Sequence, residues 1–301
     1  MNNKLKENII MPAWEIIQEH SQLKRFYFLP GLLSIIFLSV LLVYQAIYTY
    51  VEIFGYKEEA FQIILNFFHS SYAVEVIIGG VIFFLIYIII SPLFEWGMIK
   101  YIESLDQGKK RGVSDALWMW IYRFLPLFEY NNIFSEFKLV SILNAYLFMI
   151  RFLWVEYLSY LSSIFVFVFL FSVVLNILFS YSKYFIVVEN KKVFPSVGAS
   201  AKLAILNLAM TSKLYFLMFI LNLRVIFNFL IFLSFPLLMA VAVSLITSKI
   251  YLTIAIVIIS GVFGLLILAM WYLTAVLEIF KTALWYFAYK QAKENTQDLE
   301  Q

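Results

Sequence analysis

Six stretches of this chain are apolar over a length that matches the thickness of a lipid bilayer. A helix needs ~20 mostly apolar residues to cross the hydrocarbon core, and a helix satisfies its own backbone hydrogen bonds where no water is present. The stretches span about residues 26–51, 73–98, 138–156, 158–183, 214–246 and 250–280. The sequence therefore predicts an all-α fold, a polytopic membrane helical bundle of about six transmembrane helices.

The composition supports a lipid environment and excludes several kinds of site. Hydrophobic residues make up 63% of the 301 residues and charged residues 14%, whereas soluble domains are ~45–50% apolar and ~25% charged. The net charge of +3 is too small for a nucleic-acid interface. Because the chain has no cysteine and only two histidines, disulfides and thiolate metal sites are excluded, and we expect neither a metal nor a cofactor.

We interpret residues 1–285 as one integral membrane domain and residues 286–301 as a polar cytoplasmic tail. The end of the chain, "KQAKENTQDLEQ", is polar, so we expect it to be disordered. The N-terminal charges are followed by an apolar run that is longer than the ~7–15 residues of a signal peptide. We therefore expect the first apolar run to stay in the membrane as a span.

The positions of lysine and arginine predict the side of the membrane on which each terminus lies. If both termini are cytoplasmic, 18 of the 22 basic residues fall in inner segments and three in outer segments. Cytoplasmic loops of membrane proteins carry an excess of Lys and Arg. The distribution therefore predicts cytoplasmic N- and C-termini.

Three segments on the predicted inner side are too apolar for free loops and too short or too polar to cross the membrane. They are "PAWEIIQEHSQL" (12–23), "SDALWMWIYRFLP" (114–126) and "FPSVGASAKLAILNLAM" (194–210). In the first segment one helical face carries Ala13, Ile16, Ile17, His20 and Leu23. Such a pattern is typical of a helix that lies in the membrane interface. The sequence thus predicts two or three interfacial amphipathic helices on the inner leaflet.

Each of these short segments precedes a basic residue and then an apolar run. The basic residues are Lys24, Lys138 and Lys213. Two interpretations remain open. The chain contains three copies of one unit, made of an interfacial helix, a basic anchor and a transmembrane hairpin, or the enrichment of basic residues at inner membrane edges alone generates the similarity.

The stretch "SYSKYFIVVENKKVFPSVGASAKLAILNLAM" (180–210) resembles a pattern in a diffuse group of bacterial multi-pass membrane proteins. The pattern is a helix ending in "VVEN", a turn, a small-residue helix that contains Ser200, and an Asn before the next span. The stretch "WEIIQEHSQLKRFYFLP" (14–30) is similar to the start of such proteins. The group includes the membrane domain of some glycerophosphoryl diester phosphodiesterases. The resemblance implies a membrane module rather than that enzyme, because no residue here matches the phosphodiesterase active site.

Arg224 is unusual because an ionisable side chain at membrane depth is costly and often functional. Further polar residues in the apolar runs complete a candidate intramembrane site: Asn222, Asn228, Asn176 and Glu278. If the fifth span begins at Leu214, Arg224 lies ~15 Å along it and needs a partner. If the embedded part is 225–246, Arg224 lies at the inner edge, and 214–223 is covered by other protein or lies at the surface. A structural role and a substrate-binding role both remain open.

Basic residues beside the predicted inner surface are candidates for contact with anionic lipid headgroups, each contributing ~1 kcal/mol there. They are Lys109, Lys110, Arg111, Lys191 and Lys192. We interpret the acidic residues near the first inner loop as solvated charges: Glu95, Glu103, Asp106 and Asp115. The sequence has no G-x-S-x-G motif, and its two histidines are predicted on opposite sides of the membrane, so we expect no catalytic site.

Two functions remain open. The first is a non-catalytic multi-pass membrane protein that acts as a scaffold, an assembly partner or a lipid-interacting module. The second is a transporter or flippase-like protein with a polar intramembrane site around Arg224, which a cavity lined by that arginine and its neighbouring asparagines would favour. Both place the chain in a cell membrane, which the resemblance makes the bacterial cytoplasmic membrane. The expected partners are membrane lipids and either other membrane proteins or a homo-oligomer, and not nucleic acid.

Overall fold

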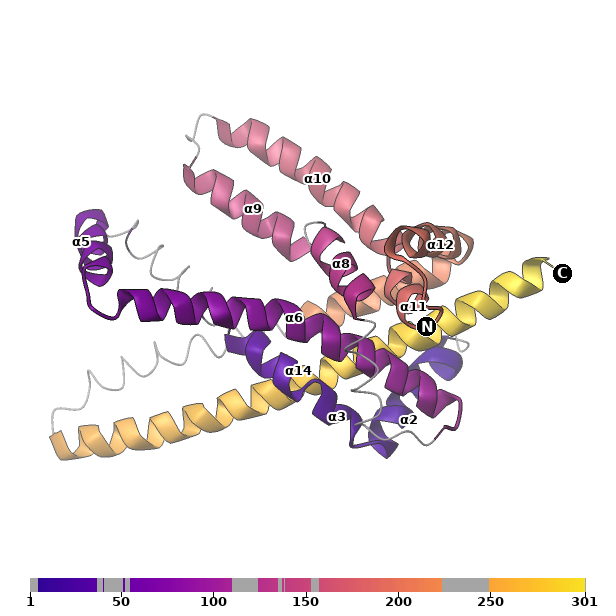
Figure 1. Cartoon of the computed structure of the whole chain (residues 1–301), viewed down its shortest axis with the longest axis horizontal. Helices are drawn as coiled ribbons and strands as arrows, with labels where there is room; N and C mark the ends of the chain where they lie inside the picture. Colours follow the sequence, from indigo (N-terminus) through magenta and orange to yellow (C-terminus); the bar gives the residue numbers. More distant parts are fainter. Residues whose placement is uncertain are drawn as a thin grey trace.

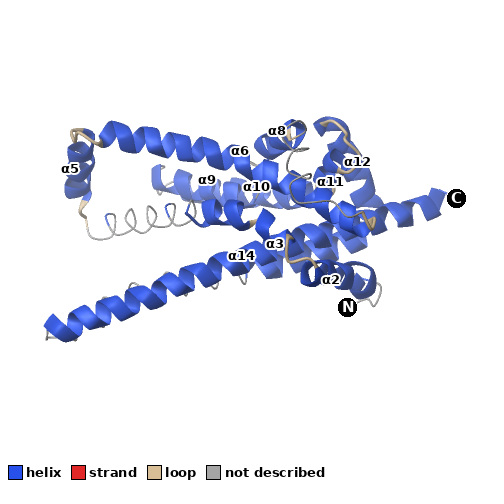
Figure 2. Cartoon of the chain, turned by 60° about the horizontal axis from the view of Figure 1, so that its bottom comes forward, coloured by secondary structure: helices blue, strands red, loops and turns tan. Residues whose placement is uncertain are grey.

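The computed structural model is helical throughout (Figure 2), over described residues 5–36, 40, 51, 55–109, 124–134, 137, 139–152, 157–223 and 249–300. No strand occurs among them, which confirms the all-α class. The long helices are α6 (Ala73–Asp106), α10 (Leu158–Leu178) and α14 (Lys249–Glu300). The shorter elements are the π-helical turn η1 (Lys6–Ile10), α2 (Met11–Glu19), α3 (Leu23–Phe26), α5 (Lys57–Phe68), α8 (Leu125–Phe134), α9 (Leu139–Phe152), α11 (Ser182–Val187) and α12 (Val193–Leu206).

Within the described ranges, three helical runs are long and apolar enough to cross a membrane. They are α6, the run Leu158–Val187 that includes α10 and α11, and the part Thr253–Asp298 of α14. A fourth crossing is counted if α12 and the helix Leu208–Leu223, which are bent by 102° relative to each other, form one broken span. The described residues thus associate the chain with a membrane.

The prediction of six spans is only partly reproduced. The third predicted span, 138–156, corresponds to α9, whose 14 residues are too few to cross alone. Half of the first predicted span, 26–51, and most of the fifth, 214–246, lie outside the described residues. The number of six spans therefore stays a prediction.

The long helices diverge at one end of the molecule and meet at the other (Figure 1). Their diverging parts are apolar and exposed, as at Val74 in α6 (64% exposed) and Leu265 in α14 (69% exposed). Their converging parts are buried, as at Ile102 and Leu284, which are both 0% exposed. Apolar surface without protein cover is stable only in an apolar medium. The diverging halves are therefore the lipid-facing part, and the protein's own core lies at the converging end.

The core joins the C-terminal parts of the three long helical runs to the N-terminal helices. Trp96 of α6, Tyr181 beside α11 and Leu284 of α14 belong to one buried cluster, together with Ala13 and Ile17 of α2. The apolar face of segment 12–23 was expected to lie in the membrane interface, but these two residues of that face pack inside the protein instead. The periodicity of a sequence does not distinguish a lipid surface from a protein surface, since both are apolar.

The expectation that the end of the chain, 290–301, is disordered is wrong for residues 290–300, which belong to α14. α14 is one helix of 52 residues, ~78 Å long, against a hydrocarbon core of ~30 Å. Beyond residue 285 it buries one face, comprising Tyr286, Phe287, Ala288, Tyr289 and Ala292. Asn295 and Thr296 of this segment are also hydrogen-bonded to Asn207, so the end of α14 packs against the rest of the protein.

The 102° bend between α12 and the helix Leu208–Leu223 is held by hydrogen bonds of Asn207. Its Nδ2 donates to the Ala292 carbonyl at 3.3 Å and to Thr296 Oγ1 at 3.2 Å. Its Oδ1 accepts from Asn295 Nδ2 at 3.1 Å. An asparagine side chain offers such partners in place of the continuous helical ladder. The bend directs α12 away from the following helix, as expected if α12 lies across the end of a span.

Replacing Asn207 by leucine is expected to lower the free energy of unfolding by about 2 kcal/mol. The substitution leaves buried polar groups of α14 without their partner, and leucine cannot replace those bonds. Urea or SDS titration in detergent micelles, followed by tryptophan fluorescence, measures the change. The matched control is Asn66→Leu in α5, where the side chain is exposed and we expect a change within ~0.5 kcal/mol. Equal effects of the two substitutions would show that the bend does not depend on Asn207.

Candidate functional site

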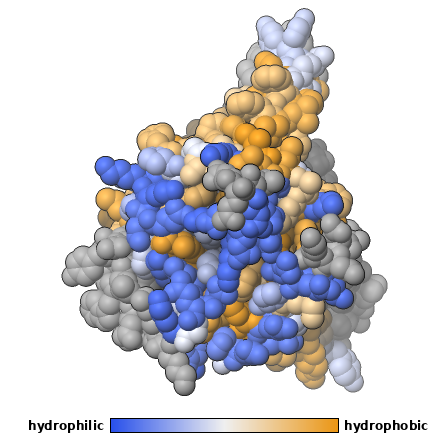
Figure 3. Space-filling model, turned by 90° about the vertical axis from the view of Figure 1, so that its right-hand side faces the viewer, coloured by the Kyte–Doolittle hydropathy of each residue, from blue (hydrophilic) through white to orange (hydrophobic). Residues whose placement is uncertain are grey.

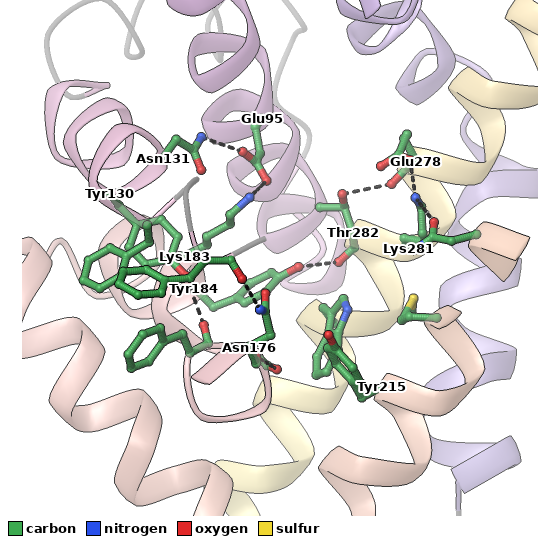
Figure 4. Close-up of a pocket in the computed structure, with 17 residues that line it drawn as sticks. Glu95, Tyr130, Asn131, Asn176, Lys183, Tyr184, Tyr215, Glu278, Lys281 and Thr282 are labelled. Carbon is green, nitrogen blue, oxygen red and sulfur yellow. Dashed lines mark hydrogen bonds and ion pairs between the residues drawn. The ribbon is translucent and has the colours of Figure 1, made fainter. Parts of the chain in front are cut away.

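A cavity of about 390 Å³ lies where the diverging helices meet the core (Figure 4). We call it the fork cavity. Its polar lining residues are Glu95, Asn131, Asn176, Ser180, Lys183, Asn222, Glu278, Lys281 and Thr282. Its aromatic lining residues are Tyr130, Phe134, Phe137, Phe179, Tyr184, Tyr215 and Trp285. The volume lies within the ~300–1,000 Å³ typical of ligand pockets, and the lining combines charged groups with rings.

One wall of the fork cavity holds an ion pair between two helices. Glu95 lies on α6 just after its apolar part, and its Oε1 accepts from Lys183 Nζ of α11 at 2.5 Å. Both side chains are largely buried, with 22% and 27% of their surface exposed. Asn131 Nδ2 of α8 donates to the other carboxylate oxygen at 3.1 Å. The Glu95 carboxylate thus connects α6 to both α8 and α11 through hydrogen bonds.

The opposite wall holds a second charged group on α14. Lys281 Nζ donates to Asn222 Oδ1 of the helix Leu208–Leu223 at 2.9 Å and also pairs with Glu278, one turn earlier on α14. Between the two walls, the Tyr184 hydroxyl donates to the Thr282 carbonyl at 3.0 Å. Figure 4 shows this hydrogen bond between the two ion pairs. The cavity therefore presents two separate pairs of opposite charge rather than one basic or acidic patch.

Asn176 borders the cavity with its amide already bonded to backbone. Its Nδ2 donates to the Phe137 carbonyl at 2.6 Å and to the Ser172 carbonyl at 2.8 Å. These bonds join α10 to the residue that precedes α9. Satisfying a polar group inside an apolar helix in this way removes most of the cost of burying it. Asn176 therefore shapes the wall rather than offering a free donor.

Three of the five residues predicted for an intramembrane polar site line this cavity. They are Asn176, Asn222 and Glu278, whereas Arg224 and Asn228 lie outside the described residues. The structure also bears on the alternative positions of 214–223. Leu214 and Met218 are buried, 0% and 5% exposed, so one face of this run packs against the rest of the protein; both interpretations allow that, and the depth of Arg224 stays a prediction.

Sequence reasoning missed Glu95 and Lys183. Glu95 was interpreted as a solvated charge, which is wrong because it pairs with Lys183 and is largely buried. Asp106 was interpreted in the same way, and its carboxylate pairs with Lys290 at 2.9 Å. The sequence did offer one signal for this pair: an acidic residue lies near the end of one apolar run, 73–98, and a basic residue ends another, 158–183. No sequence pattern indicates that those two ends face each other.

A second polar cluster lies at the hydrophilic end of the molecule (Figure 3). Glu189, in the turn between α11 and α12, accepts from Lys191 at 2.7 Å, from Lys293 at 2.6 Å and from the Tyr289 hydroxyl at 2.5 Å. The turn is completed by Asn190 in the left-handed region, with φ of 54°. Burial alone would raise the pKa of the Glu189 carboxyl, but these hydrogen bonds lower it from 4.5 to about 2.

The unfolding free energy is therefore expected to fall as the pH drops from ~4.5 towards ~2. The pKa of Glu189 is lower in the folded chain than in the unfolded chain, so its stabilisation is complete above the unfolded value and is lost as pH approaches the folded value. Thermal unfolding in detergent, from pH ~6 to pH ~2.5, would measure this for wild type and Glu189→Gln. The difference between their melting temperatures should shrink as pH falls, and a constant difference would contradict the assignment.

The predicted headgroup-contacting residues are partly engaged within the protein. Lys191 pairs with Glu189, with 42% of the lysine side chain exposed, and Lys109 Nζ donates to Gln107 Oε1 at 2.7 Å. Lys192 is exposed before the first turn of α12, and 110–111 lie outside the described residues. Among the described residues, no group of three or more histidine, aspartate or glutamate side chains is placed to hold a metal ion.

The stretch that carries the family resemblance has a definite local structure. Ser200 of α12 is fully buried. Its hydroxyl donates to the Leu178 carbonyl at 2.7 Å and accepts from the Tyr181 backbone N–H at 3.0 Å. These two bonds satisfy backbone groups on either side of the break between α10 and α11. Comparison with family models, curated proteins and solved structures gives no match. The resemblance to the membrane domain of glycerophosphoryl diester phosphodiesterases therefore stays a prediction.

Proposed function

We propose that this chain is a non-catalytic multi-pass membrane protein that binds the polar headgroup of a membrane lipid in the fork cavity. The observation that carries the proposal is the position of the cavity. It lies where the exposed apolar halves of α6, α10 and α14 end and the buried core begins, as seen in the placement of its lining residues.

This position suits an amphiphile for a simple physical reason. A charged headgroup needs polar partners because an unpaired charge is costly in an apolar medium, and the two ion pairs of the cavity offer such partners. Acyl chains need apolar neighbours, which the exposed halves of the long helices offer in abundance, as at Phe167 and Val257. The cavity and the adjoining helix surfaces can therefore contact the headgroup and the acyl chains of one lipid molecule.

The proposal assigns binding rather than catalysis to the cavity, since each of its carboxylates is already paired with a lysine. The proposal includes the predicted topology of about six spans with both termini in the cytoplasm. The excess of basic residues in the inner segments supports this orientation. The chain ends seen in Figure 1 lie at the converging end of the helices. We further propose that the protein resides in the bacterial cytoplasmic membrane. There it acts as a scaffold or assembly partner for other membrane proteins or for a second copy of itself.

The direct test is to identify phospholipid that copurifies with the protein and to narrow the cavity. Replacing Ser180, which lines the cavity, by phenylalanine is expected to reduce bound phospholipid by ~10-fold or more, because the ring occupies headgroup volume. Native mass spectrometry of gently extracted protein measures the bound fraction. The control is Ser163→Phe, at an exposed position of α10, which should leave it unchanged. Lipid-free wild-type protein, or equal occupancy in both variants, would contradict the proposal.

A second candidate function is movement of the bound headgroup between leaflets. It is favoured by the convergence of Asn176, Asn222 and Glu278, three residues from apolar runs, on one cavity. Fluorescent phospholipid in proteoliposomes, bleached from outside by a membrane-impermeant reductant, distinguishes the two functions. Faster loss of protected signal with wild-type protein than with Ser180→Phe would support translocation, and equal rates would leave binding alone.

A further inference from the structure

Among the residues that the structure describes, the charged side chains that line the fork cavity sum to a net charge of zero. Of the described residues that line it, four carry a formal charge: Glu95, Lys183, Glu278 and Lys281. They form two pairs, one between α6 and α11 and one within α14. A net anion is attracted most strongly by a cation that has no acidic partner, whereas both lysines of the described lining are paired with a glutamate.

The two pairs also lie apart, with a neutral group between them. The hydrogen bond from the Tyr184 hydroxyl to the Thr282 carbonyl, 3.0 Å long, separates the pairs (Figure 4). A ligand that fills the cavity therefore meets a positive and a negative group on each side. It also meets the rings of Tyr130 and Trp285, whose faces attract an ammonium group.

This arrangement discriminates between classes of headgroup. A net anion would have to compete with Glu95 and Glu278 for the two ammonium groups, and would add an uncompensated negative charge to a partly buried site. A net cation would have to compete with Lys183 and Lys281 for the two carboxylates and would add an uncompensated positive charge. A headgroup with one charge of each sign extends both pairs into a larger neutral network and adds no net charge.

We infer that the headgroup bound in the fork cavity is zwitterionic, with a phosphate and an ammonium group, as in phosphatidylethanolamine and phosphatidylcholine. The inference rests on the proposed lipid-binding function and specifies its ligand. The phosphate accepts hydrogen bonds from a lysine of one pair, and the ammonium group lies against a carboxylate and the neighbouring rings.

The first experiment measures the preference of the wild-type protein. Protein exchanged into lipid-free detergent is mixed with equimolar phosphatidylethanolamine and phosphatidylglycerol of the same acyl chains, and native mass spectrometry counts the adducts. We expect ~10-fold more of the zwitterionic adduct. Soluble phosphoethanolamine is then added at about 1 mM, a concentration at which a site for a lipid retains its ligand because acyl chains contribute affinity. Full displacement would reassign the site to a free phosphorylated amine and overturn the lipid ligand.

The second experiment changes the net charge of the cavity. Glu278→Gln leaves one positive charge in excess, and the preference should shift ~10-fold towards phosphatidylglycerol. Glu278→Gln with Lys281→Gln restores neutrality and should restore the preference for the zwitterion, with weaker binding overall. The control is Glu75→Gln, an exposed carboxylate on α6 far along the chain from Glu95, which should change nothing. If the single variant does not fold, Lys281→Gln alone tests the opposite sign and should weaken phosphatidylglycerol binding further.

The outcomes separate the two proposals. Absence of any bound phospholipid overturns the proposed function. Binding without preference, or with preference for phosphatidylglycerol, overturns the zwitterionic headgroup alone and leaves lipid binding in place. A wild-type preference that neither charge variant alters would locate the discrimination outside the fork cavity and would equally overturn the inference.

Discussion

Replacing Leu284 by alanine should lower the free energy of unfolding by about 3 kcal/mol. Leu284 lies on α14, is 0% exposed and belongs to the core at the converging end of the helices. Alanine there loses the transfer free energy of the missing carbons and leaves a cavity that a closely packed core does not refill. Denaturant titration in detergent micelles, followed by tryptophan fluorescence, measures the effect.

The control for this prediction lies on the same helix. Leu265 is 69% exposed and belongs to the lipid-facing half, so Leu265→Ala should change the free energy of unfolding by less than ~1 kcal/mol. The contrast between the two leucines tests the position of the core, not only the importance of one residue. If Leu265→Ala cost as much as Leu284→Ala, the diverging halves would be packed against protein in the membrane, and the division into a lipid-facing part and a core would be wrong.

The helices themselves were predictable, because long apolar runs have few other solutions in lipid. What the apolar pattern does not reveal is the kind of apolar surface that a helix faces. The face of 12–23 was expected at the membrane interface, and Ala13 and Ile17 pack in the core instead. The end of α14, from residue 290, was expected to be disordered, and Ala292 is buried within it. Lipid and protein interior impose the same periodicity, so only tertiary structure separates them.

The candidate site was predictable to a similar degree. Asn176, Asn222 and Glu278 were visible because a polar residue interrupts an apolar run, and all three line one cavity. Glu95 and Lys183 carry the other ion pair and were missed, because a charge at the inner end of a span already has a general explanation. The pairing between them depends on how α6 and α11 converge, and sequence spacing contains no information on that.

The second large effect is expected at this missed pair. Replacing Lys183 by methionine should lower the free energy of unfolding by about 3 kcal/mol, since it leaves the Glu95 carboxylate largely buried without its cation. The double variant Lys183→Met with Glu95→Gln should recover most of the loss, because it removes both charges and not only the compensating one. The difference between the double variant and the sum of the single variants gives the coupling energy of the pair.

A matched lysine with a different degree of burial makes this prediction specific. Lys290 pairs with Asp106 at 2.9 Å, but 48% of its side chain is exposed, so Lys290→Met should cost less than ~1 kcal/mol. Water screens and solvates the charges of an exposed pair, whereas the pair at the fork cavity has little water to replace a lost partner. If both lysine variants cost the same, Glu95 would be a solvated charge, as its position in the sequence alone suggests. The fork cavity would then be open to water and unsuited to hold a headgroup by paired charges.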